Sequence, residues 1–504
     1  MTNEKQILIG FLTIIFLVFT FLPVFAQHRG DDLAYQGLDF INTNGVKALA
    51  MGGAYTSMSG ELDALFYNPA GLVGINGFQM SINANSYNKL WRERQDYRPN
   101  RQVVTLSFIL DGLYTPKPDY NGWYDYEVFL DDSTYTVNDP ILGEDPYGEE
   151  SADWQKKIRD SGINNIVAAL PFKLLGKKFV LSAGYSNQVL VTNYDRNQTY
   201  LDPHPAYDGY GEIPDRVTSV EDSLRINWYN YERERTGPLT NISSALSVAL
   251  NNHLKLGLGI NILSGKTDDF HALKKIGYFD LVEGYNVYRF SYDTSNVITK
   301  GSSSYAAAQF NIGAIVNLGK LNLGANFTLP YKIKREYDYT IETFTPDTTN
   351  IINYSNNDEM KIPFSFAFGL SINPISKFTI AFDLKHRPFK NAEFILAAND
   401  STHRDWIDQT SFGIGVEYKP FDFLSILGGY KNIPQVFIPD GAAIKDRGPE
   451  ADCYTMGISA KIPYGRLDIA YEIRILKYYD VYYSNTNWAY ESFKNISFGY
   501  TFIL

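Results

Sequence analysis

The chain has 504 residues, of which 44% are hydrophobic and 15% aromatic, and its formal net charge is −11. This acidic balance argues against nucleic acid as a partner, because phosphate recognition needs clustered Lys and Arg. The single cysteine, Cys453, excludes an intrachain disulfide framework and a cysteine-based zinc site, and the six histidines lack ligand spacing. We therefore expect no cofactor and no metal.

Residues 1–26 have the pattern of a secretory signal peptide. Lys5 gives a weakly positive start, residues 7–22 are uncharged and apolar, and Ala26 supplies a small residue before a cut at Gln27. A transmembrane anchor is the alternative, since about twenty apolar residues can span a bilayer. Pro23 and Ala26 favour cleavage, so the sequence predicts export across the inner membrane.

Residues 27–76 contain two compact motifs and no strand pattern. The first motif is Gly52-Gly53-Ala54, and the second is Asn68-Pro69-Ala70-Gly71-Leu72, with Asp63 between them. Small residues let one backbone approach another closely, and Asn-Pro favours a turn. An ordinary periplasmic lead-in would not need this concentration of glycine and alanine, so we predict a hatch, or plug, packed inside a lumen.

Residues 77–87 form the first predicted strand, with Phe78, Met80, Ile82 and Ala84 alternating. The segment 102–110 also resembles a strand. Counting it as a span would reverse every later hairpin, so we place it within a long first outer loop, 88–162.

The acidic stretch from Asp111 to Asp153 carries twelve acidic residues and one basic residue, Lys117. We expect a solvated loop that divalent cations hold to neighbouring lipopolysaccharide. A cap that binds a cation or a partner is the alternative, although the Asp spacing is not that of an EF-hand.

Six hairpins of one polarity follow. In 239–265, for example, alternating apolar residues lead into the tight turn at Asn251 and out of it again. The connection within each hairpin is short and the connections between hairpins are long, as in membrane β-barrels. The six hairpins cover residues 163–192, 239–265, 305–334, 361–387, 410–430 and 453–476.

The hairpins, the first strand and an apolar last strand, 495–504, give about fourteen strands, an even number as in bacterial single-chain barrels. The predicted fold is therefore an all-β transmembrane antiparallel barrel over residues 77–504. In 361–372, Ile362, Phe364, Phe366, Phe368, Leu370 and Ile372 share one face, opposite mostly small residues. Those small residues either face something that fills the lumen or relieve crowding in a curved wall.

All six tryptophans fall in the predicted outer loops or at their edges. An aromatic girdle at the membrane interface is the expectation. A vestibule that captures apolar or ring-containing ligands is the sharper alternative. The residues are Trp91, Trp123, Trp154, Trp228, Trp406 and Trp488.

At the two motifs of 27–76 the chain resembles the FadL-like outer-membrane transporters, which include aromatic-hydrocarbon channels and PorV-type relatives. The resemblance implies a fourteen-stranded barrel with a hatch, located in the bacterial outer membrane among lipid and lipopolysaccharide. It also implies passive uptake of hydrophobic small molecules, such as long-chain fatty acids or aromatic hydrocarbons. The long first loop departs from this family.

The family's route implies a lateral opening where a strand fails to pair, and Pro or Gly can cause such a failure. The candidates are Pro171, Gly184, Pro330, Gly428 and Gly429.

Two other functions are compatible with parts of the sequence. A PorV-like barrel that hands cargo to a secretion system would use the acidic, Tyr-rich loops to bind secretion proteins. An outer-membrane enzyme would need a nucleophile, a base and an orienting group in reach of one another. His204, His271 and His403 lie in predicted loops without such a motif, so we predict that the protein is not an enzyme.

Overall fold

The computed structural model describes residues 35–40, 42–97, 145–205, 224–282, 287–397, 406–439, 447–482 and 485–504. The predicted signal peptide, the segment 102–110 and most of the acidic stretch lie outside these residues. In the described ranges, no helix is long and apolar enough to cross a bilayer.

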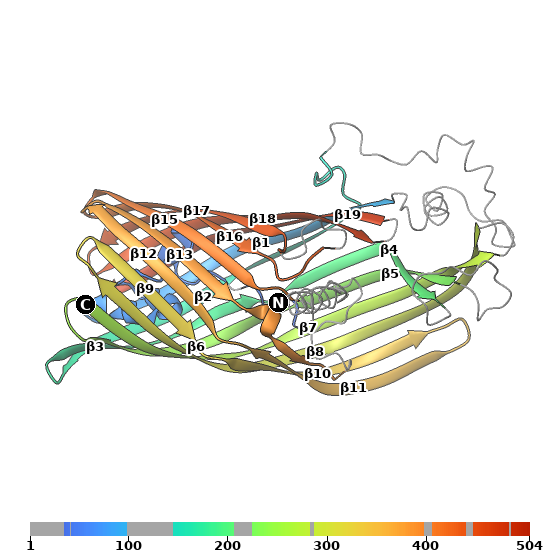
Figure 1. Ribbon diagram of the computed structural model, residues 1–504, viewed down its shortest axis with the longest axis horizontal. Coiled ribbons are helices and arrows are strands. Elements are labelled where there is room, and N and C mark those ends of the chain that lie inside the picture. The colour runs from blue at the N-terminus through green and yellow to red at the C-terminus, as the bar shows by residue number, and fades with distance from the viewer. Residues whose placement is uncertain are drawn as a thin grey trace, which may run out of the picture.

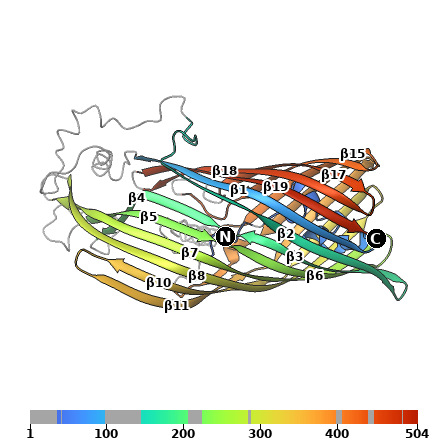
Figure 2. The same ribbon diagram turned by 180° about the vertical axis from the view of Figure 1, so that it is seen from behind.

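Fourteen antiparallel strands close into a barrel, which Figures 1 and 2 show from opposite sides. The last strand pairs with the first along its whole length, from Gln79↔Ile503 to Tyr97↔Asn485, so the ring has no open end. In order round the ring the strands are β1 (Gln79–Tyr97), β2 (Trp154–Leu174), β3 (Lys177–Leu190), β6 (Pro238–Ala249), β7 (Leu254–Val282), β8 (Val287–Asn317), β9 (Leu321–Thr328), β12 (Ser365–Ile375), β13 (Phe378–Arg387), β15 (Gln409–Phe421), β16 (Leu424–Pro434), β17 (Glu450–Ile462), β18 (Gly465–Tyr482) and β19 (Asn485–Ile503).

The predicted strand count and all six hairpins are confirmed. The tight turns gather at one end of the barrel, where the C-terminus also lies and the Leu504 N–H donates to the Phe78 carbonyl at 3.0 Å. The predicted loop 88–162 was wrong at both ends. β1 continues to Tyr97 and β2 begins at Trp154, because the two strands pair with each other from Gln79 to Glu93.

The barrel is apolar outside and polar inside. On β1, Met80 and Ile82 are 37% and 44% exposed, whereas Ser81 and Asn83 between them are buried. The same alternation recurs on the other strands, for example at Phe368 and Leu370 on β12. This arrangement is the reverse of that in a soluble protein and identifies the outer belt as a lipid-facing surface.

At the end opposite the tight turns, one side of the barrel extends into a tall sheet (Figure 1). β7 and β8 have 29 and 31 residues, whereas about 9–11 residues span a bilayer. The outer parts of these strands therefore stand above the membrane. The other members of the tall sheet are β4 (Asn193–Pro205), β5 (Leu224–Thr236), β10 (Tyr331–Phe344) and β11 (Thr349–Ile362), with β14 (Glu393–Ile395) against β11 after the short helix η4 (Phe389–Asn391).

Two breaks divide the tall sheet from the barrel wall. β9 ends before Leu329-Pro330, and β11 ends before Pro363-Phe364. The inward face changes phase at the second break, so Ile362 is buried inside while Phe364 and Phe368 are exposed. The prediction of one continuous face over 361–372 was therefore wrong for Ile362, because Pro363 interrupts the strand.

Candidate functional site: a plugged lumen with a central cavity

The N-terminal segment 42–76, here called the plug, lies inside the ring of strands (Figure 1, blue). It contains the helices α2 (Val46–Ala50), α3 (Ala64–Tyr67) and η1 (Pro69–Gly74). Ala381, Leu427 and Ala470, from three different strands, pack around α2 and the residues that follow it. Strands β2, β3 and β6 supply Val167, Ala169, Val180 and Ala245 to the part that holds α3 and η1.

Inward-facing glycines make room for the plug. At each of them, an added Cβ would come within 3.0 Å of a plug atom. Close contact of this kind explains the small-residue face that the sequence shows on 361–372, since the lumen there is filled. These glycines are Gly184, Gly257, Gly313, Gly324, Gly369, Gly413, Gly415, Gly429, Gly457 and Gly499.

Asn68 joins the second motif to the barrel wall. Its side-chain amide donates to the carbonyl of Thr56 at 2.7 Å and to the carbonyls of Ala314 and Ala325 at 3.1 and 3.2 Å. Its oxygen accepts the Ala70 N–H at 3.1 Å, which starts η1. Asn68 is 0% exposed, so a single side chain bonds the plug to two strands. Ser247 adds a hydrogen bond to the Pro69 carbonyl at 2.5 Å.

Asp63 supports the start of α2. Its carboxylate accepts the Ala48 N–H at 3.1 Å and lies where a Cβ on Gly45 would stand. Gly45 has a φ of 87°, which suits glycine at this helix start. Burial raises the pKa of Asp63 to about 7, so its charge depends on pH near neutrality.

The first motif is held by a threonine of the wall. Gly52 and Gly53 have φ values of 63° and 71° and turn the chain after α2. The Thr455 hydroxyl accepts the Gly52 N–H at 3.0 Å and donates to the Ala50 carbonyl at 3.1 Å. On the next turn, Asp383 accepts the N–H groups of Tyr55 and Thr56 at 2.9 and 2.8 Å.

An ionic cluster ties the plug to the wall near the tight turns. Lys47 lies 3.0 Å from Glu61 and 3.1 Å from Glu417, and Arg466 pairs with both Glu61 and Asp468. Burial opposes the charge on Glu61, but Arg466 and Lys47 outweigh it and hold the pKa of Glu61 below its usual value. The plug is therefore anchored by charge as well as by close packing.

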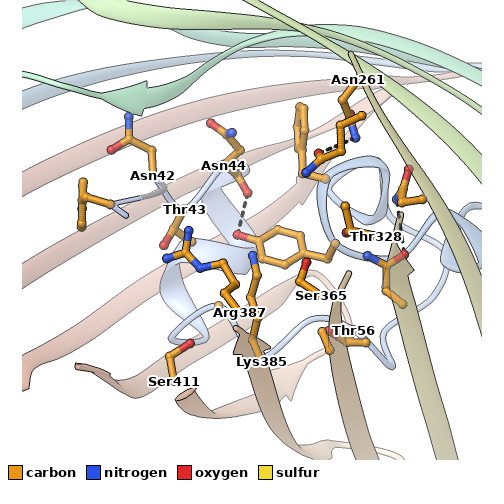
Figure 3. Close-up of a pocket in the computed structure, with 18 of the residues that line it drawn as sticks. Asn42, Thr43, Asn44, Thr56, Asn261, Thr328, Ser365, Lys385, Arg387 and Ser411 are labelled. Atoms are coloured by element: carbon orange, nitrogen blue, oxygen red, sulfur yellow. Dashed lines mark hydrogen bonds between the residues drawn. The ribbon is translucent and has the colours of Figure 1, made fainter. Parts of the chain in front are cut away.

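A central cavity of about 180 Å³ lies between the plug and the wall (Figure 3). Its inward-facing apolar lining includes Leu38, Phe66, Leu263 and Ile362. Lys385 and Arg387 of β13 and Lys431 of β16 bring three cationic side chains to the same space. Asp39 and Asp383 also line the cavity, which therefore combines an apolar surface with three cationic and two acidic side chains.

Of these three cations, Arg387 is the one that hydrogen-bonds to other residues of the described ranges. Arg387 donates to the Asp39 carbonyl and to the Gln409 side chain. Neither the Lys385 nor the Lys431 amine has a carboxylate within 4.0 Å among the described residues. An uncompensated ammonium in a confined site favours an anion from outside.

A second cavity of about 170 Å³ lies above the first, and Asp39 and Phe40 line both. Trp91, Trp154 and Trp406 line the outer cavity. The Arg474 guanidinium covers the Phe40 ring at 3.4 Å from its centroid, so an arginine fixes part of the partition between the cavities.

The predicted membrane girdle is wrong for three tryptophans. Trp91, Trp154 and Trp406 are 3%, 8% and 3% exposed and line the outer cavity. Trp91 and Trp154 do so because β1 and β2 are longer than expected. Trp488 is partly exposed and packs against Tyr479. Trp123 and the Trp228 side chain lie outside the described residues.

The wall changes its pairing between β2 and the β3–β4 strand. β3 pairs with β2 only as far as Ser186↔Asn165. The chain then leaves the ladder at Val191-Thr192, and the Thr192 carbonyl accepts a hydrogen bond from Lys89 of β1 at 3.0 Å. In the described ranges, β4 pairs with β5 alone, so the outer part of β2 has a partner on one side only.

This interruption leaves a notch beside β2. Residues 159–163 are all exposed, and a Cβ on Gly162 would have no atom within 4 Å among those described. Tyr194 packs against Trp91 and Trp154 with ring centroids 6.4 and 5.3 Å apart. Trp154 at the start of β2 and Asn193 and Tyr194 at the start of β4 therefore line the outer cavity on the two sides of this interruption.

The five residues predicted as strand breaks do not lie at the interruption between β2 and β4. Pro171 and Gly184 face Val180 and Val167 in the β2–β3 ladder. Gly428 and Gly429 of β16 pair with both neighbouring strands, β15 and β17. Gly429 also lies directly against the plug backbone. Pro330 stands at the bend between β9 and β10, where β8 pairs with both strands.

The cationic residues of the cavity were not identified from the sequence. The available signal was the alternation of the strand, because Lys385 and Lys431 lie two residues from the inward-facing Asp383 and Gly429. Of the three histidines considered for catalysis, His271 packs edge-on against Tyr231 at 5.1 Å. His403 and the His204 side chain lie outside the described residues.

The fold is similar to that of several solved channels. A FadL homologue from Pseudomonas aeruginosa matches with a TM-score of 0.55 and 13% identity, over 92% of this chain and 98% of that chain. The toluene transporter TodX of Pseudomonas putida matches with 0.53 and 12%, over 92% and 99%. The CymD monoaromatic hydrocarbon channel matches with 0.50 and 10%, over 91% and 97%.

No family model matches the sequence, and no curated protein sequence matches it. The chain therefore shares the FadL-like barrel fold at low sequence identity.

Proposed function

We propose that the protein lets hydrophobic molecules with an acidic headgroup, of which long-chain fatty acids are the simplest, cross the outer membrane without an energy source. The observation that carries this proposal is the central cavity, where apolar side chains adjoin Lys385, Arg387 and Lys431. The FadL-like fold and the structural similarity to hydrocarbon channels support passage of a hydrophobic molecule.

The charge of the cavity favours an acidic amphiphile over a neutral aromatic hydrocarbon. A carboxylate would accept charge-assisted hydrogen bonds from Lys385 and Lys431, which are stronger than bonds between neutral groups. A hydrocarbon would leave both ammonium groups without a partner. The apolar lining, Phe66 and Leu263 among it, would hold the chain next to the acid.

The proposed route begins at the outer cavity with its three tryptophans. It passes the Asp39–Phe40 partition into the central cavity, above the plug. It then leaves through the notch between β2 and β4 into the membrane, because an apolar chain is more stable in lipid than in water.

The lysines provide the test of this function. We expect palmitate to bind the detergent-solubilised barrel about ten- to a hundredfold more weakly after Lys385→Met and Lys431→Met together, since a hydrogen bond to a charged group contributes about 1.5–3 kcal/mol. Palmityl alcohol, which lacks the charge, should bind both proteins equally. The matched control is Lys320→Met, because Lys320 bonds the Pro374 carbonyl in an exposed turn away from the cavity. Equal palmitate affinity in the double variant and the wild type would exclude the proposed headgroup site.

One observation favours a second function. The tall sheet projects above the membrane and exposes Ile351 and Ile352 to 61% and 50%, which suits a protein-binding surface of the PorV-like kind. Partner proteins that co-purify with the barrel and are lost on deletion of 111–153 would favour that function.

A further inference from the structure

Three cations lie close together on the side of the barrel where β2, β1 and β19 are neighbours (Figure 2). The strand registers show which residues are level with one another. Asn88 of β1 pairs with Lys494 of β19 on one side and with Arg159 of β2 on the other. Two residues farther from the tight turns, Leu90 of β1 pairs with Lys157 of β2. Lys157, Arg159 and Lys494 are here called the outer cationic patch.

The outer cationic patch faces away from the lumen. Trp154 of β2 and Glu491 of β19 line the outer cavity and so face inward. Successive side chains of a strand point to opposite faces. Lys157 and Arg159 lie three and five residues after Trp154, and Lys494 lies three residues after Glu491. All three cations are therefore on the outer surface, and all three are exposed.

The outer cationic patch lies at the outer edge of the lipid-facing belt. Below Lys494, toward the tight turns, Ile496, Phe498 and Tyr500 are exposed on the same face of β19. About 9–11 residues of a tilted strand span a bilayer, and β19 ends at Ile503. Lys494 therefore stands where the span reaches the outer surface of the membrane. Long cationic side chains at such a position place their charge among the lipid headgroups.

The protein does not neutralise this patch within the described ranges. None of the three cationic groups has a carboxylate within 4.0 Å among the residues that the structure describes. Asp160 follows Arg159 but points to the other face of β2, where it accepts a hydrogen bond from Tyr87 at 3.4 Å. The other outward residues level with the patch on these strands and on β18 are uncharged: Asn88, Leu90, Ile473, Ile475 and Ser492.

We propose that the outer cationic patch binds the phosphorylated headgroup of a lipopolysaccharide molecule in the outer leaflet. Phosphate oxygens accept charge-assisted hydrogen bonds from Lys and Arg. At the backbone, Arg159 and Lys494 are about 10 Å apart, and Lys157 and Arg159 about 7 Å, so long side chains can converge on one headgroup. Arg159 also borders the notch, so the bound lipid lies beside it. This inference goes beyond the proposed function and does not rest on it.

The test measures binding of deep-rough lipopolysaccharide, which has a short sugar chain, to the full barrel in detergent. EDTA is present throughout, so that divalent cations cannot bridge the lipid to acidic residues. The same lipid with its phosphates removed enzymatically is the second probe. We expect the wild type to bind the phosphorylated lipid at least tenfold more tightly than the dephosphorylated lipid, because only the former offers anionic oxygens to the patch.

The key variant carries Arg159→Gln and Lys494→Gln together. Its affinity for the phosphorylated lipid should fall about thirtyfold, as the loss of two cations at a charged lipid surface would give. The matched control carries Lys300→Gln and Lys332→Gln, which remove the same charge from exposed positions. Lys300 lies 3.2 Å from Glu342 and Lys332 lies 2.9 Å from Glu359, so these cations already have partners and the control should bind like the wild type.

Equal affinity of the two double variants for the phosphorylated lipid would overturn the inference, as would equal affinity of the wild type for both forms of the lipid. Millimolar inorganic phosphate should not displace the lipid, and displacement would show an anion site without preference for lipid. If the key variant does not fold, as judged by the gel mobility of unboiled protein, Lys157→Gln with Lys494→Gln replaces it under the same expectation. Palmitate should bind all these variants equally, because the patch lies outside the lumen.

Discussion

Replacing Gly429 by Ala is expected to displace the plug from the barrel. The added Cβ would lie 2.3 Å from the Gly52 nitrogen and 2.4 Å from the Met51 carbonyl carbon. Both are backbone atoms, so no side-chain rotation relieves the clash. Overpacking of this kind destabilises by about 1–3 kcal/mol, and we expect the upper end because the backbone itself must move.

The measurement is single-channel conductance in a planar bilayer, together with protease access to the plug. The variant should conduct ions and lose the plug to protease, while the wild type should do neither. Gly428→Ala is the control, because its Cβ would meet no atom closer than Val416 at 3.8 Å. Identical behaviour of the two variants would mean that the plug does not seal the lumen at Gly429.

Asn68→Ala is expected to have the second large effect. It removes the donor shared by the carbonyls of Thr56, Ala314 and Ala325, and it removes the acceptor for the Ala70 N–H. Buried backbone groups left without partners cost about 1–3 kcal/mol each. Some will find other partners, so we expect plug docking to weaken by about 3 kcal/mol in total.

Protease cleavage of the plug against time measures this effect. Cleavage should be about a hundredfold faster than in the wild type if it tracks the population of the undocked plug. Asn76→Ala is the control, since Asn76 is an exposed amide of the same segment that bonds only Lys178 at 2.8 Å in the described structure. Equal cleavage of the two variants would show that Asn68 is not the anchor.

The barrel wall was predictable because its signals are local. Each spanning strand must show lipid one face and the lumen the other, so residues such as Met80 and Ser81 alternate in kind. Each tight turn is a few residues long, and parity between turns fixes the strand count. The two motifs at Gly52 and Asn68 marked the segment that fills the lumen, because its turns and close contacts require particular residues.

The notch was not predictable from the same signals. No Pro or Gly stands at Val191-Thr192, and the chain leaves the ladder there because of distant contacts. Lys89 donates a hydrogen bond to the Thr192 carbonyl. The backbone of Val191 packs closely on Gly37, where an added Cβ would lie 3.2 Å from it. The residues at the predicted breaks have other roles. Pro330 lies at the bend between β9 and β10, and Gly184 and Gly429 leave room for the plug.

The cavity could not be predicted from the sequence for a related reason. Lys385, Lys431 and Asn241 come from three strands that are far apart in the sequence, and each is an ordinary lumen-facing polar residue in its own strand. Only the closure of the ring brings them to one space. In the proposed function, the cavity is the ligand site and the notch beside β2 is its exit into the membrane.

The central claim, that a ligand leaves sideways through the notch, has one direct test. Gly162→Cys, labelled with a bulky maleimide, should lower palmitate uptake several-fold in cells that lack the native gene, while the unlabelled variant should restore uptake. Cys453 is buried and should not react. Asp422→Cys, in an exposed tight turn, should take the label without effect. Unchanged uptake with a fully labelled residue 162 would contradict the lateral route.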